Sequence, residues 1–329
     1  MQRIPIRNEF IRRFAFCPED LNFLASDMSL RQYYRLNKAG TPGHILMDAP
    51  KPENPEQFIR IAHYLKGVGL RAPEIIGQDL DVGFVLLEDF GDQTFTKVLK
   101  QTPEVEEGLL TMAVNVLKYL HQNAIVQPPD VPLYSVQKLV AEVGVFIDWY
   151  WPFVTGSDAP LAIKQDFMER WQLVFESMPP VPSSLVLRDY HVDNLMVLES
   201  GEDVQKCGLL DFQDALWGSV VYDFISLIED ARCDTTPSLI NGLWQLFLDT
   251  VPENDHANYR EAATILGAGR HTKVLGIFTR AAMRGGNSNY LCHISRLWGY
   301  LDRSFDTCPA LGPIRDWFNL HAARLQLSI

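Results

Sequence analysis

The chain has 329 residues, 47% of them hydrophobic, so it can bury a large core and has the length of two domains or of one domain with two lobes. Its formal net charge of -12 argues against a nucleic-acid partner and is compatible with a cationic substrate. No apolar run approaches the roughly 18 residues of a membrane span, and the N-terminal residues lack the apolar core of a secretory signal, which together predict a cytoplasmic protein with no membrane partner.

The first third of the chain alternates short helical and strand patterns. Residues 8–16 have helical apolar spacing, and residues 54–67 predict a helix that begins at an Asn cap and ends at Gly67. Between and after these helices, apolar runs bounded by Gly and Pro predict strands at 33–36, 44–47, 73–78 and 83–90. We therefore expect a small sheet with a helix, which forms an N-lobe of residues 1–91.

The remainder, residues 92–329, is predicted to be a mainly helical C-lobe. Residues 105–120 are the clearest amphipathic helix. The exception is 185–211, where apolar runs with strand character are joined by a polar loop and by a turn. The fold class predicted from these patterns is α+β, with a β-rich first lobe and a helical second lobe.

The polar loop is L-R-D-Y-H-V-D-N-L-M, residues 187–196, in which Asp189 and Asn194 stand five residues apart. Asp211 ends the next strand of a predicted hairpin, which would bring the three side chains to one end. Phosphoryl transfer requires an acid beside the acceptor hydroxyl and a divalent metal on the nucleotide phosphates, and magnesium prefers oxygen ligands. Asp and Asn also satisfy tight turns on their own, but the spacing of all three favours a metal–nucleotide site.

This pattern resembles the aminoglycoside phosphotransferase family, which has a bilobal protein-kinase-like fold. Within that family the chain is most similar to the bacterial anomeric kinases of N-acetylmuramate and N-acetylglucosamine, cytoplasmic enzymes of cell-wall sugar recycling. The catalytic loop and the D-F-Q-D-A motif carry the wider resemblance, and the softer M-D-A-P, E-D-F-G and D-W-Y stretches carry the narrower one. The matching segments are 26–36, 45–50, 86–92, 148–150, 188–196, 209–215 and 221–232.

The resemblance implies a role for several residues. Asp189 would accept or orient the acceptor hydroxyl, Asn194 and Asp211 would bind magnesium, and Asp223 would support the catalytic loop. For Asp223, a helix N-terminal acid favoured by the helix dipole is the alternative. The segment whose backbone would meet adenine consists of Glu88, Asp89, Phe90 and Gly91.

The sequence departs from the family pattern at two positions. Leu187 stands where related enzymes carry a His, and because that His is structural, an apolar substitute need not abolish activity. Met47 stands where the phosphate-binding Lys is expected, so the phosphates need another cation or donor. Our candidates for nucleotide binding are Ser29, Arg31 and Arg35, and the alternative is that they only form a solvated edge strand.

The acceptor site is predicted less sharply. Trp149 and Asp148 could form a sugar platform, because an aromatic face packs on pyranose C–H groups while a carboxylate takes hydroxyls. His191 and Gln213 are further candidates to contact the substrate. For each of these a structural reading remains open: an aromatic helix end in the core, or a loop residue bonded to backbone. Weaker candidates are Glu142, Asp214, Arg280 and Arg284.

Three functions compete. The first is an ATP- and Mg-dependent small-molecule kinase that phosphorylates a sugar hydroxyl, with the anomeric hydroxyl of an N-acetylated amino sugar as the expected acceptor. The second is an O-phosphotransferase for an aminoglycoside or another amino alcohol, a cationic substrate that the net negative charge of the chain fits. The third is a nucleotide-binding regulator that has lost transfer, which Met47 favours and the joint presence of Asp189, Asn194 and Asp211 opposes.

Overall fold

The computed structural model describes residues 3–26, 30–40, 43–128, 130–286 and 288–325. Contacts divide the chain into two compact units. The first consists of Met1–Asn123 with His191–Ala215, and the second of Ala124–Tyr190 with Leu216–Ile329. The lobe boundary predicted between residues 91 and 92 falls inside the first unit and stays a prediction.

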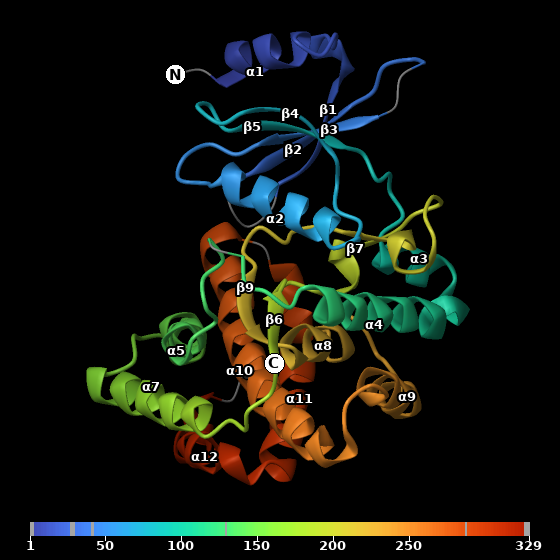
Figure 1. The fold of residues 1–329 in the computed structure, drawn as a ribbon. Coiled ribbons are helices and arrows are strands. Elements are labelled where there is room, and N and C mark those ends of the chain that lie inside the picture. The colour runs from blue at the N-terminus through green and yellow to red at the C-terminus, as the bar shows by residue number, and fades with distance from the viewer. Residues whose placement is uncertain (1–2, 27–29, 41–42, 129, 287, 326–329) are drawn as a thin grey trace. The chain divides into compact units, whose positions relative to one another are not determined.

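A five-stranded antiparallel sheet with strand order β1-β2-β3-β5-β4 forms the centre of the first unit (Figure 1). The predicted strands correspond to four of the five. The sequence patterns missed β1, an edge strand whose register with β2 is irregular between Phe23 and Ala25, so its apolar residues do not alternate cleanly. The strands are β1 (Leu21–Ser26), β2 (Gln32–Leu36), β3 (His44–Asp48), β4 (Ile75–Asp79) and β5 (Phe84–Glu88).

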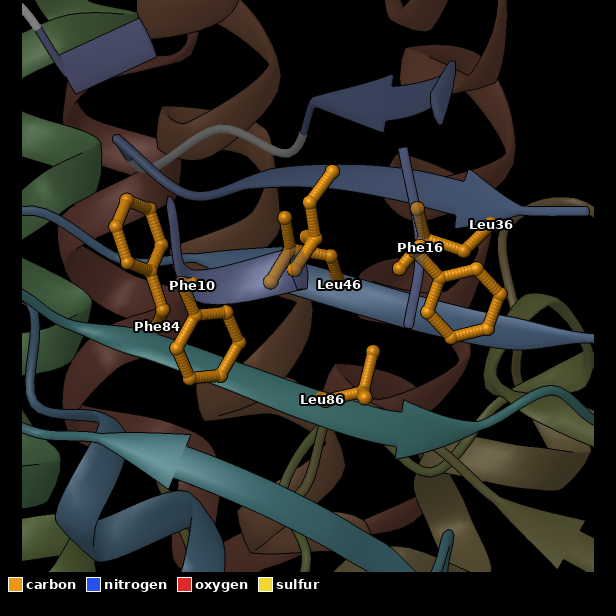
Figure 2. Packing of buried hydrophobic residues seen from close by; sticks show 7 residues of the cluster. Phe10, Phe16, Leu36, Leu46, Phe84 and Leu86 are labelled. Carbon is orange, nitrogen blue, oxygen red and sulfur yellow. The ribbon is translucent and has the colours of Figure 1, made fainter. Parts of the chain in front are cut away.

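One face of this sheet is covered by α1 (Arg3–Arg12). Phe10 and Phe16 from the N-terminal segment pack on Leu46 of β3 and on Phe84 and Leu86 of β5, and all five side chains are buried (Figure 2). Side chains two residues apart on a strand share a face. Ile45, Met47 and Leu87 therefore lie on the face opposite this core.

The opposite face of the sheet is covered by α2 (Pro55–Gly67). As predicted, the helix begins at an Asn cap: the Asn54 side chain accepts a hydrogen bond from the N–H of Gln57 at 3.3 Å. The first unit is completed by α3 (Phe95–Gln101), α4 (Glu106–Asn123) and the hairpin of β7 (Leu195–Val197) with β8 (Cys207–Leu209).

Helices dominate the second unit, and α10 packs against α5, α8, α11 and a π-helical turn at Phe146–Tyr150. Gly276 permits this approach, because a Cβ there would lie 2.4 Å from the carbonyl oxygen of Val145. The remaining helices are α5 (Val136–Val145), α6 (Trp151–Thr155), α7 (Leu161–Glu176), α8 (Val221–Ile228), α9 (Pro237–Leu248), α10 (His256–Gly285), α11 (Ile294–Thr307) and α12 (Gly312–Leu325). The predicted α+β class, with a sheet first and helices after it, is confirmed.

The predicted strands around the polar loop belong to two different ladders. β6 (Ser183–Val186) pairs with β9 (Leu216–Ser219), which the sequence patterns missed, whereas β7 pairs with β8. Asp189 follows β6 in the second unit, and Asn194 and Asp211 flank the hairpin of the first unit. Among the described residues, no helix is long and apolar enough to cross a membrane.

Candidate active site

The first unit contains a cavity of ≈ 390 Å³ that is open enough for a small ligand. Ile45 and Leu87 of the sheet line it together with Met196 and Leu210 of the hairpin region. The linker segment Glu88–Gly91 lines it as well, as do Asn194 and Asp211. One apolar cavity thus joins the predicted adenine-binding segment to the predicted metal ligands.

Asn194 and Asp211 lie side by side, with the Asn194 amide nitrogen 3.5 Å from Asp211 Oδ2. Gln213 Nε2 donates to Asp211 Oδ1 at 2.7 Å, and His191 Nε2 lies 3.5 Å from the Asn194 amide nitrogen. Gln213 and His191, predicted to contact the acceptor, therefore lie beside the predicted metal ligands. Asp211 has φ +56°, a left-handed backbone that costs a non-glycine residue about 1–3 kcal/mol and recurs at active sites.

The donor set at this position fits a hard cation. Within the described ranges no group of three or more His, Cys, Asp or Glu residues could hold a metal. An amide and a carboxylate in contact, as Asn194 and Asp211 are, nevertheless match magnesium, which usually takes one or two carboxylates and completes its shell with phosphate oxygens and water.

Arg31 is the cation beside this pair. It is only 8% exposed, and its guanidinium lies 3.5 Å from Asp211 Oδ1 and 3.7 Å from Glu53 Oε2. Met47, fully buried, lines a small cavity together with Arg31. Arg31 therefore shares a cavity with Met47, the strand position where a phosphate-binding Lys was expected.

Arg35, the other candidate arginine, is engaged differently. Its guanidinium pairs with Asp89 at 2.6 Å and with Asp92 at 2.7 Å, and it donates to the Gly91 carbonyl at 3.0 Å. Burial opposes its charge, but the hydrogen bonds and charges of the two carboxylates outweigh burial and raise its pKa. Arg35 therefore holds the linker, and Ser29 lies outside the described residues.

The Glu88 side chain is also engaged. Its carboxylate accepts hydrogen bonds from Arg71 and from the backbone N–H of Glu74. The Arg71 guanidinium lies over the Phe90 ring, 5.1 Å from its centroid, within the roughly 6 Å limit of cation–π contacts. Arg71 therefore engages the side chains of both Glu88 and Phe90 in the linker.

In the second unit, Asp223 holds the start of the predicted catalytic loop, residues 187–196. Its carboxylate accepts the backbone N–H groups of Leu187 at 2.6 Å and Arg188 at 2.9 Å. Burial raises the pKa of Asp223 to about 7, although these two bonds favour its ionised form. Arg188 has φ +72°, so the residue before Asp189 has a left-handed backbone and is fixed by Asp223.

The sequence analysis named Glu142 only as a weaker acceptor-site candidate and missed the largely buried charge cluster to which it belongs, beside this loop. Glu142 accepts hydrogen bonds from Arg188, from Lys273 at 2.9 Å and from the Tyr134 hydroxyl at 2.6 Å. Burial opposes the charge of Glu142, but Lys273 and Arg188 outweigh burial and lower its pKa. The signal for Lys273 was a polar run, R-H-T-K, within the otherwise apolar residues 265–278 of the helix.

The predicted sugar platform is only partly available. Trp149 is half-buried, and the Arg284 guanidinium lies 4.3 Å from its ring centroid. Asp148 is exposed and forms an ion pair with Lys164. Both residues belong to the π-helical turn rather than to a regular helix end, and their role in acceptor binding stays a prediction.

Comparison with known proteins identifies the class. Residues 20–262 match the model of the phosphotransferase enzyme family, and the chain belongs to that family. It is therefore an enzyme that transfers a phosphoryl group to an alcohol, as predicted.

The chain is 33% identical over 303 residues to the N-acetylmuramate/N-acetylglucosamine kinase of Pseudomonas putida, covering 89% of this chain and 86% of the relative. Its fold is similar to that of a microcompartment-associated aminopropanol kinase, at 13% identity and a TM-score of 0.62, covering 98% and 100% of the two chains. It is also similar to an ADP-bound aminoglycoside phosphotransferase, at 13% identity and a TM-score of 0.59, covering 92% and 98%. The predicted family resemblance and kinase-like fold are confirmed.

Proposed function

We propose that this enzyme is an ATP- and magnesium-dependent sugar kinase that phosphorylates the anomeric hydroxyl of N-acetylmuramate or N-acetylglucosamine. The observation that carries the nucleotide part is the single cavity that connects Glu88–Gly91 with Asn194 and Asp211. The acceptor part rests on the Pseudomonas putida relative of that name. Because ATP is the donor, we infer that the reaction takes place in the cytoplasm, with a small sugar as the acceptor substrate.

The cavity suggests how the nucleotide binds. Adenine would lie between Ile45 and Leu87 on one side and Met196 and Leu210 on the other, all apolar and in the same cavity. Its polar edge would meet backbone groups of Glu88–Gly91, because the Glu88 carboxylate is already bonded to Arg71. The phosphates would then extend toward Asn194 and Asp211.

Arg31 is the cation that we assign to the phosphates. It is buried beside Asp211, where a guanidinium could form charge-assisted bonds with phosphate oxygens. Asn194 and Asp211 would hold magnesium, which would supply positive charge to offset the charge that develops in the transition state. This assignment weakens the interpretation of the chain as an impaired regulator. Arg31 would supply the positive charge that the expected Lys at position 47 does not.

We propose that Asp189 is the residue that orients the acceptor hydroxyl. Asp189 stands five positions before Asn194 in the sequence, and an extended chain of that length spans no more than about 18 Å. The anomeric hydroxyl is more acidic than an ordinary alcohol, so Asp189 has only to orient it and take its proton late, as a loose transition state requires. Asp189→Asn should lower turnover by roughly 10²–10⁴ with little change in nucleotide affinity.

The test is to incubate the enzyme with ATP, magnesium and either sugar, and to follow phosphorus–proton coupling by NMR beside a reducing-sugar assay. A 1-phosphate cannot open its ring, so the reducing end must disappear as ATP is consumed. Coupling to the C6 protons with the reducing end intact would contradict the anomeric assignment. Turnover on an aminoglycoside or amino alcohol, with none on either sugar, would establish the second candidate function instead.

A further inference from the structure

We propose that the largely buried cluster of Glu142, Lys273, Arg188 and Tyr134 positions Asp189 and sets the charge of its carboxylate. Glu142 and Lys273 are then positioning residues of the transfer reaction, although neither contacts the nucleotide cavity. The inference rests on the proposed role of Asp189 as the acid that orients the acceptor.

The first support is geometric. Arg188 immediately precedes Asp189 and has a strained left-handed backbone, φ +72°, that persists only when its surroundings hold it. Its backbone N–H donates to Asp223, and its guanidinium donates to Glu142. Arg188 is therefore held at both ends, which fixes the direction in which the Asp189 side chain leaves the chain.

The second support is the way Glu142 itself is held. Three donors from three segments converge on its carboxylate: Arg188 from the catalytic loop, Lys273 from α10 and the Tyr134 hydroxyl. The side chains of Glu142, Lys273 and Arg188 are only 11%, 12% and 14% exposed. Three charged side chains at this depth are costly to bury. Because one of them, Arg188, directly precedes Asp189, we assign the three a function beyond packing.

The third support is the balance of charge around Asp189. Arg188 and Lys273 are cations that interact with Asp189, and the anions packed with them are Glu142 and Asp223. Arg270 is a further buried cation that acts on Asp223. The hydroxyls of Tyr134 and Tyr222 face the same cluster. Burial opposes the charge of Lys273, but the surrounding acidic groups outweigh burial and raise its pKa, so it stays cationic beside Asp189.

The two ions of the cluster must act on Asp189 in opposite senses. Lys273→Met removes a cation and makes the ionised form of Asp189 less favourable. The acidic limb of the pH profile of kcat/KM should therefore move to higher pH by about one unit. Glu142→Gln removes an anion and leaves two cations uncompensated, so the limb should move to lower pH. Both variants should lower kcat at least tenfold, with the Kd for MgATP within about twofold of the wild type.

Matched controls separate this role from a general loss of packing. Lys138→Met and Glu169→Gln change the same residue types at exposed positions of the same unit and should leave the limb and kcat unchanged. Lys273→Arg keeps the cation and should restore the wild-type limb. A limb that stays in place in folded Lys273→Met, or that moves the same way in both variants, would overturn the proposal.

A second readout does not depend on activity. The difference in unfolding free energy between each background and its Asp189→Asn derivative, followed against pH, reports the ionisation of Asp189 directly. If Glu142→Gln does not fold, Lys273→Met decides the matter, because its Glu142 still pairs with Arg188. If the wild type turns over neither sugar, the proposed acceptor is wrong, and the unfolding measurement still tests the cluster: equal pH profiles in the wild-type and Lys273→Met backgrounds would refute it.

Discussion

Replacing Arg31 by Ala should weaken the binding of ATP but not of adenosine. In the structure the guanidinium lies between two acids, 3.5 Å from Asp211 and 3.7 Å from Glu53, and it is 8% exposed. It is therefore a desolvated cation beside the group that we assign to the metal and phosphates. Adenosine carries no phosphate, so its affinity depends on the apolar part of the cavity and on the linker.

The magnitude follows from the kind of bond that is lost. A hydrogen bond to a charged group contributes about 1.5–3 kcal/mol, and each 1.4 kcal/mol is about tenfold in affinity. Arg31→Ala should therefore weaken MgATP about ten- to a hundredfold. The variant also leaves Asp211 and Glu53 without the intervening guanidinium, which adds repulsion toward phosphate, so the upper part of the range is expected.

The assay is calorimetric titration of both ligands into the wild type, Arg31→Ala, Arg35→Ala and the double variant. Arg35 holds Asp89 and the Gly91 carbonyl of the linker, so its removal should weaken ATP and adenosine to the same extent. The exposed Arg12→Ala serves as the matched control and should change neither. Equal losses for adenosine and ATP in Arg31→Ala, or ATP affinity unaltered in all three variants, would refute the phosphate assignment.

Three further predictions concern single side chains. Asp211→Ala should abolish magnesium-dependent nucleotide binding while circular dichroism stays unchanged, and a titration that matches the wild type would exclude the metal role. Burial raises the pKa of Asp223 to about 7 in the folded protein, so the unfolded chain releases this proton at lower pH than the folded chain does. The wild type should therefore lose stability, on the order of 4 kcal/mol, as pH rises from about 4 to 7. Asp223→Asn should lack this pH dependence in denaturant titrations. Gly276→Ala places a Cβ against the Val145 carbonyl and should lower the free energy of unfolding by about 1–3 kcal/mol, whereas Gly242→Ala, with open space around it, should not lower it.

Local features of the fold could be predicted because short-range interactions decide them. The Asn54 cap, the helix that ends at Gly67 and the paired strands β2 and β3 depend on hydrogen bonds and sterics within a few residues. The family assignment was equally local, since residues 187–196 and 209–215 carry its motifs in contiguous stretches. The edge strand β1 escaped because its irregular register breaks the alternation on which strand prediction depends.

Which charged side chains pair with one another could not be predicted, because the pairing depends on segments that are far apart in the chain. Arg31 and Arg35 look equivalent in the sequence, four residues apart on one segment, yet one lies beside Asp211 and the other holds the linker. Lys273 meets Glu142 across 131 residues. The sequence by itself determined which residues can carry the chemistry, through their type and spacing. Only the tertiary structure decided which charges meet, because burial in a low-dielectric interior makes the pairing of distant charges a property of the whole packing and not of any local pattern.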